Sequence, residues 1–154
     1  MKIQLLVNYD RAPKFRRRTL AVLIRQIIRE ERREADSINV VLVDDDYLLD
    51  VNRKFLNHDY KTDVISFDLS ENKRIDGEIY ISVDRAKVQA RRYKVSLERE
   101  VLRLIVHGVL HLAGWDDKTR SQKLLMRKRE NVFISARGGS ASGRERLYGK
   151  RNRA

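Results

Sequence analysis

The chain has 154 residues, of which 42% are hydrophobic and 36% are charged. This length predicts one domain with a substantial buried core, and the composition excludes an intrinsically disordered protein. Cysteine is absent, which excludes disulfides and thiolate metal sites and suits a cytoplasmic protein. No apolar run approaches the roughly 20 residues that cross a bilayer, and the N-terminus does not resemble a signal peptide, so we expect no membrane association.

The formal net charge is +12, and the positive charge is concentrated towards the end of the chain. Residues 118–154 hold 12 Lys and Arg against 2 Asp and Glu, a net charge of +10, which leaves +2 for the first 117 residues. Such a segment suits a polyanionic partner, because cations that neutralise phosphates release counterions on binding. The alternative is a solvated tail and helix face that keep the protein in solution.

The first third of the chain predicts a strand, a helix and a second strand. Residues 2–7 alternate weakly, as in a short strand, and Pro13 occupies a plausible helix start. Apolar residues at helical spacing then predict an amphipathic helix over about residues 14–35. The arginines on its polar surface are interpreted as a solvated face rather than an RNA groove. Residues 38–43 are a β-branched run, typical of a buried strand.

Three consecutive aspartates, residues 44–46, come next. We interpret them as a cap and first-turn acids of a helix over about residues 46–55, rather than as metal ligands. A polar loop then leads into a strand at residues 62–67, and a short polar turn separates it from another strand at residues 77–82. Two strands joined in this way predict an antiparallel pair.

The second half of the chain is predominantly helical. Residues 84–93 predict a helix, and Ser96 caps the start of a long apolar helix. Residues 118–136 predict a last helix, with part of the core expected beneath its apolar residues (Leu124, Leu125, Val132 and Phe133). The order of elements argues an α+β fold with a mixed α/β sheet rather than a doubly wound sheet. Residues 1–137 are the expected domain, and residues 138–154, rich in Gly, Ser and Arg, are an expected flexible basic tail.

The residues with the clearest chemistry lie between Val106 and Asp117. Two of the three histidines, His107 and His111, stand four positions apart, so both imidazoles share one helical face. Gly114 permits the left-handed turn that ends a helix, and Asp117 follows where a reversed chain returns towards the histidines. Two imidazoles and a carboxylate with one position left for water describe an open hydrolytic zinc site. The alternative is a buried histidine pair bonded to backbone, with Asp117 an ordinary surface residue.

The same spacing occurs in the zinc proteases with the pattern H-E-x-x-H-x-x-G-x-x-(H/D). Their general base is the glutamate after the first histidine, and this chain has Gly108 there. The chain therefore has the metal-binding residues of such a peptidase but lacks its general base.

Three segments resemble the YbeY family of bacterial ribosomal-RNA maturation factors, which are metal-dependent single-strand endoribonucleases. Residues 107–116 match its signature H-G-x-L-H-L-x-G-x-D-H throughout, and Asp117 replaces the last histidine. Residues 62–67 match T-D-V-(L/I)-S-F, and residues 77–82 match G-(D/E)-I-x-I-S. The resemblance covers roughly residues 1–136.

The resemblance implies a mixed, mostly four-stranded sheet packed with helices, with a metal site at the end of a buried helix. It implies one Zn²⁺ per chain on His107, His111 and Asp117, and single-stranded ribosomal-RNA precursors as substrates. The resemblance also implies roles in processing the 16S RNA 3′ end and in ribosome quality control. The expected partners are the ribosome or small-subunit assembly proteins, and the protein is expected to be a cytoplasmic monomer.

Two positions depart from the family pattern. Asp117 is a competent but harder zinc ligand than imidazole, so it bears on the identity of the metal. Leu56 stands where most relatives have an arginine important for activity, and that role does not transfer to this chain. His58, two residues later, is a candidate for a polar contact to RNA and for a catalytic role.

The mechanism expected of such a site has two open routes: an activated water attacks the phosphorus, or it acts as a base on the ribose 2′-hydroxyl. Lys118 and Arg120 are the nearest cations in sequence and are expected to position the RNA. Trp115 either stacks on a base or, as we favour, packs the turn as a core aromatic. Two other function classes stay open: a zinc peptidase-like hydrolase, and a non-catalytic RNA-binding ribosome-assembly factor with a structural metal.

Overall fold

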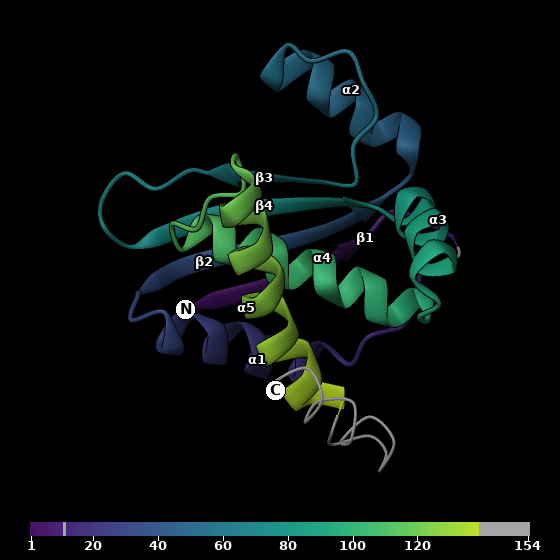
Figure 1. The fold of residues 1–154 in the computed structure, drawn as a ribbon. Helices are drawn as coiled ribbons and strands as arrows, with labels where there is room; N and C mark the ends of the chain where they lie inside the picture. Colours follow the sequence, from purple (N-terminus) through teal and green to yellow (C-terminus); the bar gives the residue numbers. More distant parts are fainter. Residues whose placement is uncertain (11, 139–154) are drawn as a thin grey trace.

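A computed structural model describes residues 1–10 and 12–138 and contains one mixed four-stranded sheet (Figure 1). The strand order is β1-β2-β4-β3. Strands β1 and β4 run parallel to β2, and β3 runs antiparallel to β4. The bounds are Lys2–Val7 for β1, Ala35–Val43 for β2, Val64–Asp68 for β3 and Ile75–Ser82 for β4. The predicted antiparallel pair and the mixed α+β fold are both confirmed.

Helices pack on both faces of this sheet (Figure 1). Helices α1, α3, α4 and α5 contribute to the larger core, whereas α2 packs over the opposite face beside β3 and β4. The bounds are Arg17–Glu30 for α1, Asp45–Leu56 for α2, Val83–Tyr93 for α3, Leu97–Leu112 for α4 and Arg120–Gly138 for α5. The order of elements along the chain is the predicted one.

Helix α4 lies between the sheet and α5, and it is buried along most of its length. Gly108 allows its close approach to the sheet, because a Cβ at this position would lie 2.6 Å from Ile79 Cγ2 of β4. Side-chain caps start the helices that surround this layer. Asp44 Oδ1 accepts from the Tyr47 amide at 2.7 Å, which confirms the capping interpretation of the aspartates, and Ser96 caps α4 as predicted.

The predicted bounds of the first helix were wrong at both ends. Pro13 is buried in a non-helical segment instead of starting the helix, and helix α1 begins four residues later, at Arg17. It ends at Glu30 because Arg32 adopts a left-handed conformation with φ of 55°, and β2 already begins at Ala35. Apolar periodicity stops at Ile28, so the last expected turn had no core face to stabilise it.

The predicted core face of helix α5 was correct only in part. Phe133 is buried as expected, but Leu124 and Leu125 are 60% and 56% exposed, and Met126 and Ile134 are buried instead. The buried stripe is set by how α5 crosses α4 and α1, which the local sequence does not specify.

The part of the chain that the structure describes contains no helix both long and apolar enough to cross a membrane. The expected basic tail, apart from Gly138 at the end of α5, falls outside the described residues.

Candidate metal centre

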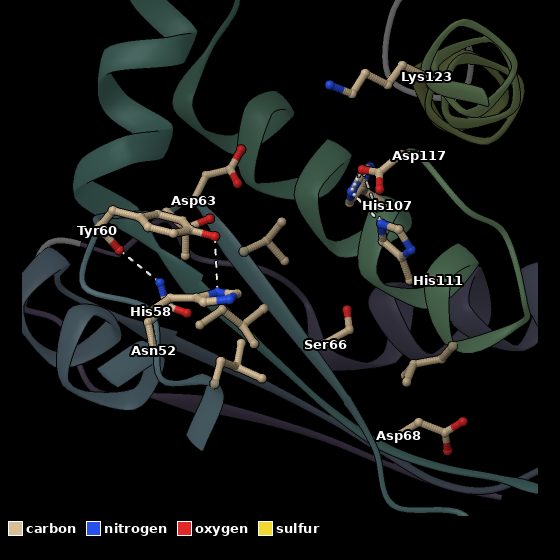
Figure 2. Close-up of a pocket in the computed structure, with 15 residues that line it drawn as sticks. Asn52, His58, Tyr60, Asp63, Ser66, Asp68, His107, His111, Asp117 and Lys123 are labelled. Atoms are coloured by element: carbon tan, nitrogen blue, oxygen red, sulfur yellow. Dashed lines mark hydrogen bonds and ion pairs between the residues drawn. The ribbon is translucent and has the colours of Figure 1, made fainter. Parts of the chain in front are cut away.

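The C-terminal end of α4 and the turn after it bring three ligand groups together. His107 and His111 face the same side of α4, and Gly114, with φ of 112°, reverses the chain so that Asp117 returns over them (Figure 2). Asp117 Oδ2 lies 3.3 Å from Nε2 of each histidine, and the two Nε2 atoms are 3.0 Å apart. The proximity predicted from the spacing is therefore confirmed, and these residues form a cluster able to hold a metal ion.

The second ring nitrogen of each histidine has a partner that only accepts hydrogen bonds. His111 Nδ1 lies 2.9 Å from the Trp115 carbonyl oxygen, and His107 Nδ1 lies 2.7 Å from Glu130 Oε2. Nδ1 must therefore carry the hydrogen in both rings, which leaves both Nε2 lone pairs directed at the gap between the rings and Asp117. Lone pairs so close repel one another unless a proton or a metal cation lies between them.

The spacing of these three atoms fits zinc. Zinc bonds of about 2.0–2.1 Å at tetrahedral angles place neighbouring ligand atoms about 3.3 Å apart. The observed separations of 3.0, 3.3 and 3.3 Å are close to this value. Three protein ligands leave a fourth position for water or substrate.

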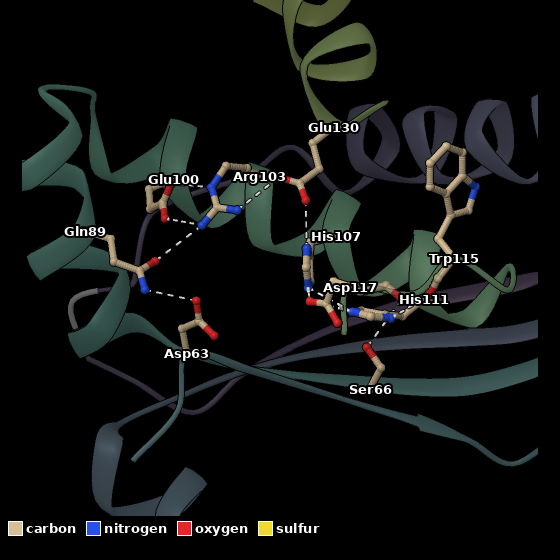
Figure 3. Close-up of polar contacts among 11 residues, drawn as sticks. Asp63, Ser66, Gln89, Glu100, Arg103, His107, His111, Trp115, Asp117 and Glu130 are labelled. Atoms are coloured by element: carbon tan, nitrogen blue, oxygen red, sulfur yellow. Dashed lines mark hydrogen bonds and ion pairs between the residues drawn. The ribbon is translucent and has the colours of Figure 1, made fainter. Parts of the chain in front are cut away.

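Behind the ligands lies a buried charge cluster (Figure 3). Glu130 is 2% exposed and bridges His107 to Arg103, whose Nη1 lies 3.0 Å from Glu130 Oε1. Arg103 also makes two bonds of 2.8 Å to Glu100, which is 1% exposed. Burial by itself would raise the pKa of Glu130, but the bonds from His107 and Arg103 hold that pKa below its ordinary value. Glu130 is therefore ionised and fixes the His107 ring.

The buried charges behind the histidines also favour a cation. Glu100 and Glu130 both bond to the single guanidinium of Arg103, so this buried group carries a net charge of −1. A cation held between the histidines and Asp117 would offset that charge.

A cavity of about 780 Å³ opens beside the ligands, between α4, β3 and the loop after α2 (Figure 2). All three histidines line it, since His58 stands on the wall opposite His107 and His111. The His58 ring stacks on Tyr60, with centroids 5.1 Å apart, and its Nδ1 lies 3.0 Å from the Tyr60 hydroxyl. His58 therefore lies on the cavity wall and not in the ligand cluster.

A second hollow of about 350 Å³ adjoins the ligands on the α5 side, and it shares His107, Asp117 and Lys123 with the first cavity. Of the two cations that the sequence suggested for positioning the RNA, Arg120 lines this hollow, and Lys118 is absent from the described lining of both hollows. Trp115 is partly buried against the core, and its Nε1 donates to Glu31 at 2.9 Å, which favours the packing interpretation over base stacking.

Sequence reasoning missed Glu130, Lys123 and the cavity residues Ser66 and Asp68. A signal for Glu130 existed, because a carboxylate at this position interrupts the buried stripe of α5 at helical spacing from Met126 and Ile134. For Ser66 and Asp68 the sequence predicted a strand over residues 62–67 but not which elements lie above it.

Gly108 bears directly on the peptidase alternative. The glutamate base of the proteases would need a side chain at a position where even a Cβ would lie 2.6 Å from Ile79. The close packing of α4 on β4 therefore explains why this position is glycine. It also disfavours a general base there.

The His-His-Asp cluster lies at the mouth of an open cavity, and an ionised, buried network lies behind it. On a mixed sheet, this arrangement is that of a metal-dependent hydrolase. The family model described as "Endoribonuclease YbeY" matches residues 6–138. The chain belongs to this family of nuclease hydrolases, which are metal-dependent.

Two curated relatives, both named endoribonuclease YbeY, illustrate the similarity. That of Flavobacterium psychrophilum is 44% identical over 108 residues, covering 70% of this chain and 77% of the relative. That of Chlorobaculum parvum is 38% identical over 123 residues, covering 80% and 87%. A solution structure from Thermotoga maritima superposes with a TM-score of 0.60 at 26% identity, covering 90% of this chain and 93% of the other.

Proposed function

We propose that this protein is a zinc-dependent endoribonuclease that cuts single-stranded ribosomal-RNA precursors, at the 16S 3′ end and in ribosome quality control. The observation that carries the proposal is the convergence of two Nε2 lone pairs and one carboxylate oxygen at the mouth of the large cavity. The proposed ligands are His107, His111 and Asp117. The proposed partners are the ribosome or small-subunit assembly proteins, met in the cytoplasm by a monomer.

When bound, zinc lowers the pKa of a coordinated water and stabilises negative charge on a phosphoryl oxygen. The protein supplies the rest of the site. Glu130 and the Trp115 carbonyl oxygen hold the two imidazoles in the required tautomer. Lys123, whose side chain reaches over the cavity beside Asp117, and Arg120 provide positive charge for the phosphates flanking the scissile bond (Figure 2).

A single strand suits this cavity better than a duplex does. The wall opposite the ligands carries a stacked aromatic pair, His58 and Tyr60, and the hydroxyl groups of Thr62 and Ser66 also belong to the lining of the cavity. Unstacked bases are recognised by stacking and by hydrogen bonds at their edges, which a duplex does not expose. A role for His58 as a contact to RNA follows from this arrangement.

The test is metal content measured beside RNA cleavage. We expect about one zinc per purified chain, cleavage of single-stranded RNA that stops with a chelator, and recovery when zinc is restored. Protein that neither contains nor takes up zinc would contradict the site. Cleavage that persists without metal would contradict the mechanism, and metal-loaded protein without cleavage would favour a non-catalytic RNA-binding factor.

Leu56 offers a test of the family's missing arginine. Leu56 is 39% exposed and lines the large cavity, so it is not a core residue. Leu56→Arg is expected to raise single-turnover cleavage, by roughly tenfold, because a cation there stabilises phosphoryl charge. Zinc content and melting temperature should hardly change. Leu56→Gln, which adds polarity without charge, is the control; an equal gain in both variants would show that charge is not the cause.

We also propose that residues 138–154 add electrostatic affinity for RNA. Their five Lys and Arg beyond the Gly/Ser segment motivate this proposal. Deleting residues 139–154 should leave the melting temperature intact, weaken RNA binding and reduce its dependence on salt. An unchanged salt slope in the truncated protein would show that the tail does not contact RNA.

A further inference from the structure

The metal centre lies where two hollows of different character meet. The large cavity has carboxylates in its wall, Asp63 and Asp68, with polar and aromatic groups. The hollow on the α5 side has three cations in its lining, Arg120, Lys123 and Arg127, beside Asp117 and Glu130, and Lys123 also reaches the large cavity. A polyanionic strand that crosses the metal centre therefore meets two unlike surfaces.

The cations of the second hollow form a stripe along α5. Positions 120, 123 and 127 follow helical spacing and extend over about 10 Å of helix. The side chains of Arg120 and Lys123 form no hydrogen bond or ion pair with any residue that the structure describes. By contrast, Arg103 beneath them is fully engaged by Glu100 and Glu130. The stripe therefore presents cations that are not neutralised from within the described protein.

The hollow continues towards α3. Arg103 and Arg127 also line a further hollow of about 270 Å³ with Tyr93 and Arg99. The Arg127 guanidinium lies over the Tyr93 ring, 5.3 Å from its centroid. A stacked guanidinium keeps its N–H edge free to donate, so Arg127 is held in place without losing its capacity to bind an anion.

We propose that this groove between α4 and α5, lined by Arg120, Lys123 and Arg127, binds the backbone phosphates of the RNA on one side of the scissile bond. The large cavity then receives the nucleotide on the other side. The inference rests on the proposed function and specifies which part of the site holds which part of the strand. Phosphates match the groove because its free groups are cationic donors, whereas the bases match the polar and aromatic wall.

The experiment measures binding of a short, labelled single strand to the zinc-loaded protein at several salt concentrations. The strand carries 2′-O-methyl groups and phosphorothioate linkages to prevent turnover. Each lost phosphate contact reduces the steepness of log K against log salt by about 0.7 for single strands, so the affinity of the variant falls about fivefold less than that of the unaltered protein for each tenfold rise in salt. Lys123→Gln and Arg127→Gln are each expected to show this loss. Arg127→Lys should recover the slope because it restores the charge.

Arg18 provides the matched control, because it is an exposed arginine of α1 that is absent from the described lining of these hollows. Arg18→Gln removes the same charge and should leave the slope unchanged. Equal losses in Arg18→Gln and Lys123→Gln would overturn the groove in favour of diffuse attraction. An Arg127→Lys variant as weak as Arg127→Gln would assign Arg127 to packing α3 against α5 and overturn its phosphate role. If the unaltered protein cleaves RNA but Lys123→Gln has the same salt slope, the groove is refuted and the proposed function stands. If the unaltered protein neither binds nor cleaves RNA, both the groove and the proposed function are refuted.

Discussion

Replacing Asp117 by alanine is expected to abolish zinc binding and RNA cleavage together. The variant leaves two Nε2 lone pairs 3.0 Å apart with no carboxylate to complete the set. Loss of groups that merely orient a ligand costs about 10–100-fold in metal affinity, so loss of a ligand itself should exceed that range. Zinc titration and single-turnover cleavage measure the two losses in the same preparation.

Two variants make this result specific. Asp117→His restores the family's usual three histidines and should keep most of the zinc. Asp116→Ala removes the same charge one position earlier, from an exposed residue outside the ligand cluster, and should leave zinc content unchanged. If Asp117→Ala keeps full zinc occupancy and activity, the third ligand lies elsewhere, and His58 across the cavity becomes the next candidate.

Replacing Glu130 by glutamine is expected to reduce both stability and zinc affinity. The two carboxylate oxygens accept from Arg103 and from His107, whereas a carboxamide has one acceptor, so one donor must face an NH₂ group. Breaking a buried charge pair in this way should cost about 3 kcal/mol, a drop in melting temperature of roughly 10 °C. With the His107 ring less firmly held, zinc affinity should fall by about 10–100-fold.

Glu100→Gln separates the two effects. Glu100 is as buried as Glu130 and is bonded to the same Arg103, and its contacts do not include His107. This variant should therefore lose stability while keeping zinc affinity near that of the unaltered protein. Equal losses of zinc affinity in both variants would show that Glu130 acts through general stability and not through the orientation of His107.

Local pattern was sufficient for the ligand cluster. Two histidines at i and i+4 must share a helix face, and Gly114 is the residue that a reversing turn requires, so the position of Asp117 followed from neighbours in sequence. The capping roles of Asp44 and Ser96 were equally local, because a cap bonds to amides only three residues away. The alternating strand and the helical periods likewise predicted the order of the elements.

What only the tertiary structure decided involves residues that are distant in the chain. Glu130 meets His107 across 23 positions because α5 crosses α4, and His58 faces the ligands because β3 pairs with β4 at the sheet edge. The same crossing buries Met126 and leaves Leu124 exposed. Helical periodicity shows that a helix has an apolar side, but the crossing of two helices selects which side chains are covered and which charges meet. The sequence alone therefore predicted the cluster of His107, His111 and Asp117, and packing determined the network and the two hollows around it.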